Sequence, residues 1–453
     1  MKGLSLLVAV ALFMEFLDGS ALNPAIPKIA ASFGVAAVDL GPVASAYAIS
    51  LAIFILPSGW LADRFGPRPV FATAIAVFTA GSLFSAMAGS AMELLFGRVL
   101  QGIGGAMMFP VGRLIVLKVT PRSQLLNVMT RLVWPAQLAP ILGPVVGGYL
   151  TDAFSWRAIF LINLPIGIAA IAAALHLIPK FETPPQRPFD TKGFVLAALA
   201  LTMLLACVDR LVDATGGVTF VALAFVAFCA TALFARHLRH HPRPILTFEA
   251  MRHDCFRRSL LGGTGARIVL NAVLFLLPLM LQLCRSYTAL DAGLVLMPFF
   301  VGVVAMQPFT TRILRAVGFR AILVTNSLLQ GGFVALCAVM VDAVSLSPLP
   351  VLLFLAGASR SLQITAVSTL TFADVPEEHI GSANLLNAVS FHVSAAFGIG
   401  IGAALVQVGG AVMPDLLAAF RVVFLVSAAA ATLLAFDFAR LPANAGETVA
   451  GRR

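Results

Sequence analysis

Apolar stretches long enough to cross a lipid bilayer recur along almost the whole chain. A membrane-spanning helix needs about 20 mostly apolar residues to cross about 30 Å of hydrocarbon. Of the 453 residues, 60% are hydrophobic and 11% carry a formal charge, against roughly 25% charged residues in ordinary soluble domains. The chain is therefore expected to be an all-α integral membrane protein. The apolar runs predict fourteen spans, over residues 3–23, 41–62, 69–89, 92–115, 126–150, 157–178, 193–211, 217–235, 259–284, 291–311, 321–342, 348–371, 381–408 and 417–439.

The first apolar run is expected to be retained as a span. Lys2 precedes it, as a basic residue precedes the apolar part of a secretion signal. However, the run contains Glu15 and Asp18, which a secretion signal would avoid, and no small-residue cleavage site follows cleanly.

The net charge of +10 is interpreted as a consequence of membrane topology and does not indicate a nucleic-acid-binding surface. With the N-terminus inside, most of the 30 lysines and arginines fall in inner segments. The outer segments hold only Lys28, Arg157, Arg210, Arg285 and Arg421. This asymmetry satisfies the positive-inside rule and predicts that both termini are cytoplasmic.

Two polar stretches divide the spans into groups of six, two and six. The first contains residues 182–187, and the second covers residues 236–259. We therefore expect an N-terminal six-helix bundle over 1–180, a linker with two additional transmembrane helices over 181–258, a C-terminal six-helix bundle over 259–440 and a cytoplasmic tail over 441–453.

The second polar stretch contains four histidines: His237, His240, His241 and His253. Histidine is a common zinc ligand. In the sequence, however, these histidines stand among arginines with no carboxylate or cysteine partner nearby, so a solvated interfacial loop is predicted and no metal site. The cysteines, which are Cys207, Cys229, Cys255, Cys284 and Cys337, show no spacing that suits a metal or redox site.

The loop after the second span reads GWLADRFGPR from Gly59 to Arg68. An acid, Asp63, and two arginines, Arg64 and Arg68, at a tight inner turn can bridge neighbouring helix ends and release them when the helices separate, which would make a conformational latch. A plain positively charged inner turn is an equally good interpretation.

The fourth and fifth spans carry small residues at helical spacing. The fourth contains Arg98 followed by QGIGG in residues 101–105, and the fifth contains Gly143, Pro144, Gly147 and Gly148. Glycines four residues apart let helix backbones approach closely in lipid, and proline adds a local kink. A role in packing alone explains these glycines equally well.

In this order and spacing, these elements resemble the major facilitator superfamily, specifically its fourteen-span drug/proton antiporter branch. The resemblance implies two six-helix bundles, two inserted linker helices and rocking alternating access. It also implies that the gating motif consists of Gly59, Asp63, Arg64, Gly66 and Arg68. The antiporter signature would consist of Gly143, Pro144, Gly147 and Gly148. Arg98 would be the buried motif arginine, and Asp18 the membrane-embedded acid.

The chain departs from the family pattern in its inner loops. Pro67 and Pro69 stand where basic residues are usual around Arg68. The equivalent loop of the second half, residues 311–318, keeps the basic residues Arg312 and Arg315 but lacks the acid. Gating is therefore expected to depend mainly on the first-half loop.

Ionisable residues inside spans are costly and are functional candidates by default. Glu15 and Asp18 are three residues apart, so they share a helix face. With a rise of about 1.5 Å per residue, Asp18 and Arg98 lie at similar depth in the membrane and can pair. We assign proton coupling to Asp18, Glu15 and Arg98, with a static ion pair as the alternative.

The second half has buried arginines instead of acids. Arg360 and Arg267 lie well inside their spans, and with Asn271 and Gln363 they are candidates for the substrate cavity. Arginines there would attract an anionic substrate. Hydrogen bonds to a carbonyl, to Asn271 or to Gln363 are the alternative. His392 could relay protons, although a packed, hydrogen-bonded histidine is the more common case.

The resemblance implies a proton-coupled secondary active transporter that exports small amphipathic molecules. A dedicated metabolite exporter or a uniporter of the same fold, including one for anionic solutes, is the alternative, and a transporter-like sensor or lipid-moving scaffold is a further one. No enzyme is expected, because no nucleophile elbow, phosphate loop or metal-ligand set occurs.

The expected partners are a small-molecule substrate, protons and the lipid bilayer of a bacterial inner membrane. We expect no nucleic acid and no cofactor besides the proton gradient. The chain is expected to be a monomer. Whether an adaptor protein binds to it is left open by the sequence.

Overall fold

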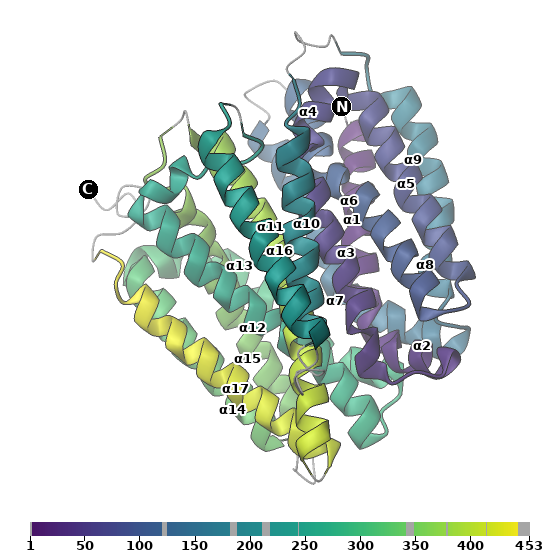
Figure 1. Ribbon diagram of the computed structural model, residues 1–453, viewed down its shortest axis with the longest axis vertical. Coiled ribbons are helices and arrows are strands. Elements are labelled where there is room, and N and C mark those ends of the chain that lie inside the picture. Colours follow the sequence, from purple (N-terminus) through teal and green to yellow (C-terminus); the bar gives the residue numbers. More distant parts are fainter. Residues whose placement is uncertain are drawn as a thin grey trace. The chain divides into compact units, whose positions relative to one another are not determined.

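The computed structural model describes residues 2–119, 125–181, 188–210, 218–242, 244–340, 348–376, 379–413 and 415–442, and throughout these ranges the regular structure is helical (Figure 1). The polar stretch 182–187 and the predicted tail beyond residue 442 lie outside them.

Each predicted span corresponds to a helix or a pair of helices. Thirteen helical segments within the described ranges are long and apolar enough to cross a membrane. The predicted span over 126–150 coincides with a further helix, α7. The helices are α1 (Lys2–Ala21), α2 (Ile26–Phe33), α3 (Gly41–Phe54), α4 (Ser58–Phe65), α5 (Pro67–Met87), α6 (Ala91–Val119), α7 (Leu125–Ala153), α8 (Ala158–Leu161), α9 (Asn163–Leu177), α10 (Thr191–Asp209), α11 (Val218–His240), α12 (Asp254–Arg285), α13 (Ala289–Val317), α14 (Phe319–Met340), α15 (Leu349–Thr371), α16 (Ile380–Val412) and α17 (Leu416–Phe438).

Two predicted spans are interrupted, and both interruptions lie next to a proline. The span expected over 41–62 is divided into α3 and α4, with Pro57 directly before α4. The span expected over 157–178 is divided into α8 and α9, and Pro165 lies in the first turn of α9. Proline has no backbone N–H and clashes with the preceding turn, so it starts helices readily and interrupts them when it falls inside.

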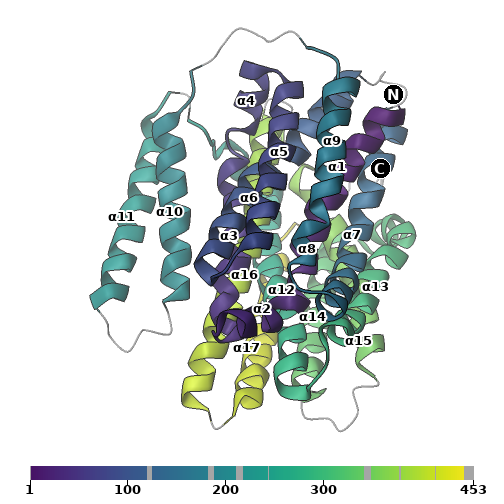
Figure 2. The ribbon, with the colours of Figure 1, turned by 90° about the vertical axis from the view of Figure 1, so that its right-hand side faces the viewer.

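The chain divides into two compact units. The first comprises Met1–Cys207, Gly216–Ile245 and Tyr287–Gly293, and the second comprises Val208–Thr215, Leu246–Ser286 and Leu294–Arg453. In the first unit, α6 packs against α3 and α5, α1 packs against α7, and α9 contacts α5 and α1. The additional helices α10 and α11 belong mainly to the first unit and run side by side (Figures 1 and 2).

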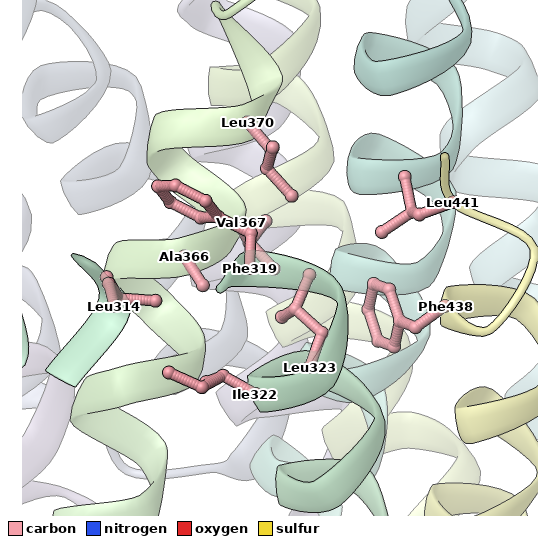
Figure 3. Close-up of a cluster of buried hydrophobic side chains, with 9 residues drawn as sticks. All are labelled: Leu314, Phe319, Ile322, Leu323, Ala366, Val367, Leu370, Phe438 and Leu441. Carbon is pink, nitrogen blue, oxygen red and sulfur yellow. The ribbon is translucent and has the colours of Figure 1, made fainter. Parts of the chain in front are cut away.

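The second unit is built around α12, α14, α15, α16 and α17. Helix α14 packs against α15 and α17, and α12 packs against α15, α16 and α17. A cluster of buried apolar side chains joins the ends of four of the unit's helices (Figure 3), with Leu323, Leu370 and Phe438 entirely shielded. Because lipid is as apolar as these side chains, close van der Waals packing stabilises the cluster more than removal from water does.

Candidate functional site

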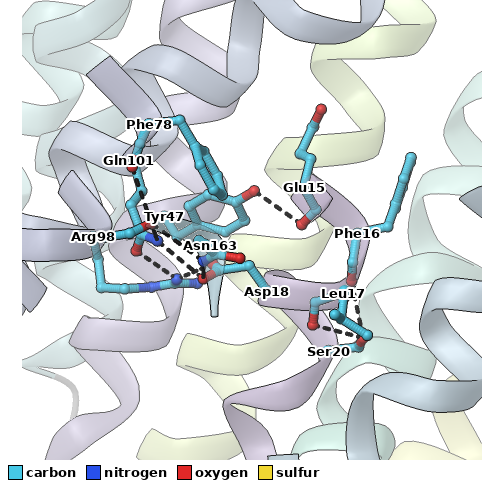
Figure 4. A network of polar contacts seen from close by, with 11 residues as sticks. Glu15, Phe16, Leu17, Asp18, Ser20, Tyr47, Phe78, Arg98, Gln101 and Asn163 are labelled. Atoms are coloured by element: carbon cyan, nitrogen blue, oxygen red, sulfur yellow. Dashed lines mark hydrogen bonds and ion pairs between the residues drawn. The ribbon is translucent and has the colours of Figure 1, made fainter. Parts of the chain in front are cut away.

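Asp18 of α1 and Arg98 of α6 form an ion pair inside the first unit (Figure 4). The side chain of Arg98 is 1% exposed and that of Asp18 is 0% exposed. Asp18 and Arg98, which were predicted to lie at similar depth in the membrane, are therefore in direct contact. A buried charge without a partner would cost several kcal/mol, so each of these side chains compensates the other.

Two side-chain amides add hydrogen bonds to this pair. Gln101 donates to Asp18 Oδ1 at 2.9 Å and to the Ser82 hydroxyl at 2.8 Å, and it accepts from Arg98 at 2.8 Å. Asn163 donates to Asp18 Oδ1 at 2.8 Å and to Ser82 at 3.2 Å. Side chains from four helices, α1, α5, α6 and α9, thus form one hydrogen-bonded network around the Asp18 carboxylate.

Aromatic rings cover the guanidinium group of Arg98. Its Cζ lies 4.1 Å from the ring centroid of Tyr47 and 5.9 Å from that of Phe160. A cation over an aromatic face is stabilised by the ring quadrupole, most strongly where water is excluded. The Nε of Arg98 has no hydrogen-bond partner among the described residues, so the rings provide a large part of the compensation on that side.

Glu15 lies one turn before Asp18 but outside the hydrogen-bonded network. Its side chain is buried, and its Oε2 has no hydrogen-bond partner within the described ranges. The Tyr47 hydroxyl donates to the backbone carbonyl of Glu15 at 3.4 Å, and the carboxyl points away from the group around Asp18 (Figure 4). The structure therefore brings together Asp18 and Arg98 and leaves Glu15 as a separate buried acid beside them.

The glycines of the predicted antiporter signature are close-packing positions. A Cβ on Gly143 would lie 1.9 Å from the Ser20 hydroxyl, and one on Gly147 would lie 2.1 Å from the Ala21 carbonyl oxygen. Both neighbours belong to the end of α1, the helix that carries Asp18. On another side of α7, a Cβ on Gly148 would lie 2.5 Å from the Ala289 carbonyl oxygen. Pro144 lies between these positions, inside α7.

The predicted gating motif forms a short helix and a sharp turn. Gly66 has φ 87°, a conformation that favours glycine, and it joins α4 to α5. Arg68 donates to the carbonyl oxygen of Leu175, so it links the start of α5 to the end of α9. Arg64 stacks on Trp60, with its Cζ 5.4 Å from the ring centroid. Asp63 is exposed and has no ion pair with any residue that the structure describes.

The predicted second-half candidates lie close together in the second unit. Arg267 is buried and donates to Ser390 at 2.9 Å and to Ser394 at 3.3 Å, both on α16. Arg360 is buried and donates to Gln363 at 3.4 Å on the same helix.

Neither of these two arginines has an acidic partner within the described parts of the chain, and the positive charge of Arg267 acts unfavourably on that of Arg360. The Nε of Arg360 has no hydrogen-bond partner there either. Asn271 donates to the Arg267 carbonyl at 2.8 Å instead of to a side chain.

Sequence reasoning missed four residues of the Asp18 site: Ser82, Gln101, Asn163 and Tyr47. Gln101 lies in the glycine-containing stretch 101–105, and Asn163 lies near the start of the span predicted over 157–178. Their polarity inside a span was an available signal. Ser82 and Tyr47 carry no such signal, because both residue types are ordinary in membrane helices.

One group of possible metal donors occurs among the described residues, formed by Asp190, His237 and His241. The expectation that the histidines lack a carboxylate partner is wrong, because Asp190 lies 2.8 Å from His237 although 47 residues separate them. Packing of α10 beside α11 produces this contact, which sequence spacing does not reveal.

The sequence matches a known family and named bacterial proteins over most of its length. The family model described as Major Facilitator Superfamily matches residues 8–384. The chain is 35% identical over 453 residues to the Klebsiella pneumoniae protein named "Putative multidrug resistance protein MdtD", covering 99% of this chain and 96% of that one. It is also 35% identical to an Escherichia coli protein of the same name, with 98% and 95% covered.

A solved structure gives the same fold at low sequence identity. The crystal structure of the peptide transporter POT in complex with sulfate superposes with a TM-score of 0.70 and 14% identity, covering 100% of this chain and 95% of that chain. The family match, the MdtD relatives and the many apolar helices identify the chain as a multi-pass membrane transporter and not an enzyme. It belongs to the Major Facilitator Superfamily.

Proposed function

We propose that the chain exports small amphipathic molecules in exchange for protons, and that Asp18 takes up and releases the coupling proton. The observation that carries this proposal is the fully buried ion pair between Asp18 and Arg98. The names of the MdtD relatives support multidrug substrates.

The pair can exist in two states that differ in charge. With Asp18 ionised, Arg98 and the amides of Gln101 and Asn163 compensate its charge. With Asp18 protonated, Arg98 loses its counter-ion and, among the described residues, keeps only Gln101 and the aromatic rings of Tyr47 and Phe160. Because removing one partner of a buried pair costs about 3–5 kcal/mol, protonation would favour any rearrangement of α1 against α6 that gives Arg98 another partner.

The remaining motif residues would serve the conformational change. Gly143 and Gly147 set the contact between α7 and the end of α1, so a movement of α1 driven by Asp18 would reach α7 directly. Arg68 links α5 to α9 through Leu175 and would maintain that end of the unit in one conformation. Glu15 would act as a second proton acceptor near Asp18.

The distribution of basic residues supports an orientation with both termini cytoplasmic, and the bacterial relatives support placement in a bacterial inner membrane. In that orientation the proton would move inward as substrate moves outward. A monomer suffices for this mechanism, because every group in the Asp18 site comes from one chain.

The proposal is tested with purified protein in liposomes under an imposed pH gradient. Asp18→Asn should abolish gradient-driven transport while the protein stays folded and monodisperse. Glu93→Gln is the matched control, because Glu93 is an exposed acid on the same helix as Arg98. Transport by Asp18→Asn that still responds to the pH gradient would overturn the proposal. Wild-type transport that is independent of the pH gradient would favour a uniporter.

A second candidate function is the export of anionic or carboxylate-bearing solutes. It rests on Arg267 and Arg360, two buried arginines that have no acidic partner among the described residues. Arg360→Ala should reduce export of anionic compounds in an efflux-deficient bacterial host and leave cationic compounds unaffected. Arg320→Ala, which removes an exposed arginine, is the control. Equal loss for cationic and anionic compounds would contradict an anion-binding role.

A further inference from the structure

A pocket of about 680 Å³ lies at one end of the paired helices α10 and α11. The start of α10 and the end of α11 line it, because the two helices run antiparallel (Figure 2). Its polar lining includes Asp190, Lys192, Arg236, His237 and His241. Nothing in the proposed transport mechanism uses this group.

Three side chains of the pocket bring metal-binding atoms together. Asp190 Oδ1 lies 2.8 Å from His237 Nε2, and Asp190 Oδ2 lies 4.0 Å from His241 Nδ1. The donor atoms of all three residues are within 4.8 Å of one another. The imidazole rings of His237 and His241 stack with centroids 4.8 Å apart.

The two histidines are held on one helix face. They are four residues apart, and the His241 amide donates to the His237 carbonyl at 2.9 Å, so the helical turn continues through His241. Histidines at positions i and i+4 of a helix are a well-established pair of zinc ligands.

The carboxylate is held in place by its own set of donors. Asp190 Oδ1 accepts from the Gly193 amide at 2.9 Å, and Oδ2 accepts from the Ile245 amide at 3.0 Å. These two backbone amides fix the orientation of the carboxylate beside the histidines, as hydrogen bonds to a ligating carboxylate do in metal sites.

We propose that Asp190, His237 and His241 bind a divalent transition-metal ion of the zinc class. Two imidazoles and one carboxylate suit such ions and leave a coordination position open for water. In a tetrahedral site with bonds of about 2.1 Å, ligand atoms lie about 3.4 Å apart. The separations of 2.8 Å and 4.0 Å lie on either side of that value, so small side-chain rotations complete the site.

An anion is the competing occupant, because Lys192 and Arg236 also line the pocket. The position of Asp190 argues against it. Its carboxylate oxygens lie 2.8 Å from His237 Nε2 and 4.0 Å from His241 Nδ1, where the negative charge would repel a phosphate or carboxylate and attract a cation. The charges of Lys192 and Arg236 lower the affinity for a cation but leave the convergence of the donors unchanged.

The metal would stabilise a segment that touches the gating motif. Phe189, which precedes Asp190, packs against Trp60 with ring centroids 4.8 Å apart. Trp60 in turn lies under Arg64. Ligation at Asp190 would therefore hold Phe189 against α4, the helix that contains part of the predicted gating motif, and link the α10–α11 pair to it.

The test uses the full-length protein without a polyhistidine tag, purified in detergent and stripped with a chelator. Zn²⁺ is titrated against a chromophoric chelator, and Co²⁺ binding is followed by its visible absorption. We expect one ion per chain and a rise in the thermal unfolding temperature. His237→Ala and His241→Ala should each weaken binding by about tenfold or more and should remove the thermal shift.

His240→Ala is the matched control. His240 lines the same pocket, but its Nδ1 bonds to the Arg236 carbonyl at 2.8 Å and it lies outside the donor group. This variant should bind Zn²⁺ like the wild type. The more exposed His241 gives an independent test if His237→Ala fails to fold.

Three results would overturn the proposal. The first is the absence of stoichiometric Zn²⁺ binding to the wild type. The second is equal weakening by His240→Ala, which would indicate unspecific surface histidines. The third is binding of inorganic phosphate that depends on Lys192 and Arg236, without Zn²⁺ binding. None of these measurements depends on transport, so failure here leaves the proposed function untouched.

Discussion

The side-chain amide of Asn163 donates a 2.8 Å hydrogen bond to Asp18 Oδ1, although 145 residues separate the two. Asn163 is the first residue of α9, so the break between α8 and α9 places its side chain at the depth of the ion pair. Asp18 thus receives hydrogen bonds from α6 and from α9, and three side chains share the compensation of one buried charge.

Replacing Asn163 with Ala should destabilise the protein by about 1–2 kcal/mol. Interhelical hydrogen bonds in membranes contribute roughly 0.6 kcal/mol on average, and bonds to charged groups contribute more. The loss should appear in reversible unfolding by a denaturing detergent. A loss no larger than that of an exposed substitution such as Leu175→Ala would mean that Arg98 and Gln101 compensate Asp18 without Asn163.

Arg98 and Asp18 should show strong coupling in a double-mutant cycle. Arg98→Gln leaves a buried carboxylate without a counter-ion and should cost about 3–5 kcal/mol. In the double variant with Asp18→Asn both charges are gone, so the combined loss should be clearly smaller than the sum of the two single losses. Additive losses would contradict a directly coupled pair.

Gly147→Ala should separate α1 from α7. The new Cβ would lie 2.1 Å from a backbone oxygen of Ala21, which cannot rotate away, and such overpacking costs about 1–3 kcal/mol. Gly59→Ala is the control, because nothing lies within 4 Å of its Cβ position. It should be neutral or stabilising by up to about 1 kcal/mol. The two unfolding midpoints, measured side by side, check this, and equal midpoints would contradict the close contact.

The stability contributed by Asp190 should disappear in acid. Its pKa is lower in the folded protein than the ordinary 3.8, so the ionised form favours folding at higher pH and the benefit falls away as the carboxylate is protonated. Asp190→Asn keeps a good helix N-cap but loses the charge that faces His237 and His241. With metal removed, wild type should unfold at a higher temperature than Asp190→Asn near pH 7. The difference should vanish as the pH falls below about 3.8. A constant difference across this range would exclude the charge as its source.

The number and order of the spanning segments could be predicted because lipid leaves a chain few choices. Backbone groups inside a bilayer must bond within a helix, so an apolar stretch of sufficient length is a helix wherever it occurs. The span predicted over 348–371 and helix α15, Leu349–Thr371, agree to within one residue. The prolines at positions 57 and 165 were visible in the sequence, but their effect of dividing two spans was not predicted.

The pairing of Asp18 with Arg98 could be inferred from depth, since helical rise converts residue number into position along the membrane normal. Depth alone does not say which way a helix faces. The shared-face argument placed Glu15 with Asp18, whereas the structure points Glu15 away from the network. The orientation of each helix about its own axis depends on its neighbours, and here the glycines of α6 and α7 determine how closely those neighbours approach.

The sequence by itself determined an all-helical membrane protein, the order of its spans, the family and the buried charges that matter. Only the tertiary structure decided which side chains meet: Asn163 and Ser82 around Asp18, Arg267 beside Ser390 and Ser394, and Asp190 beside His237. The physical reason is one of range. Helix formation in lipid depends on residues a few positions apart, whereas these contacts depend on the packing of helices that are distant in the chain.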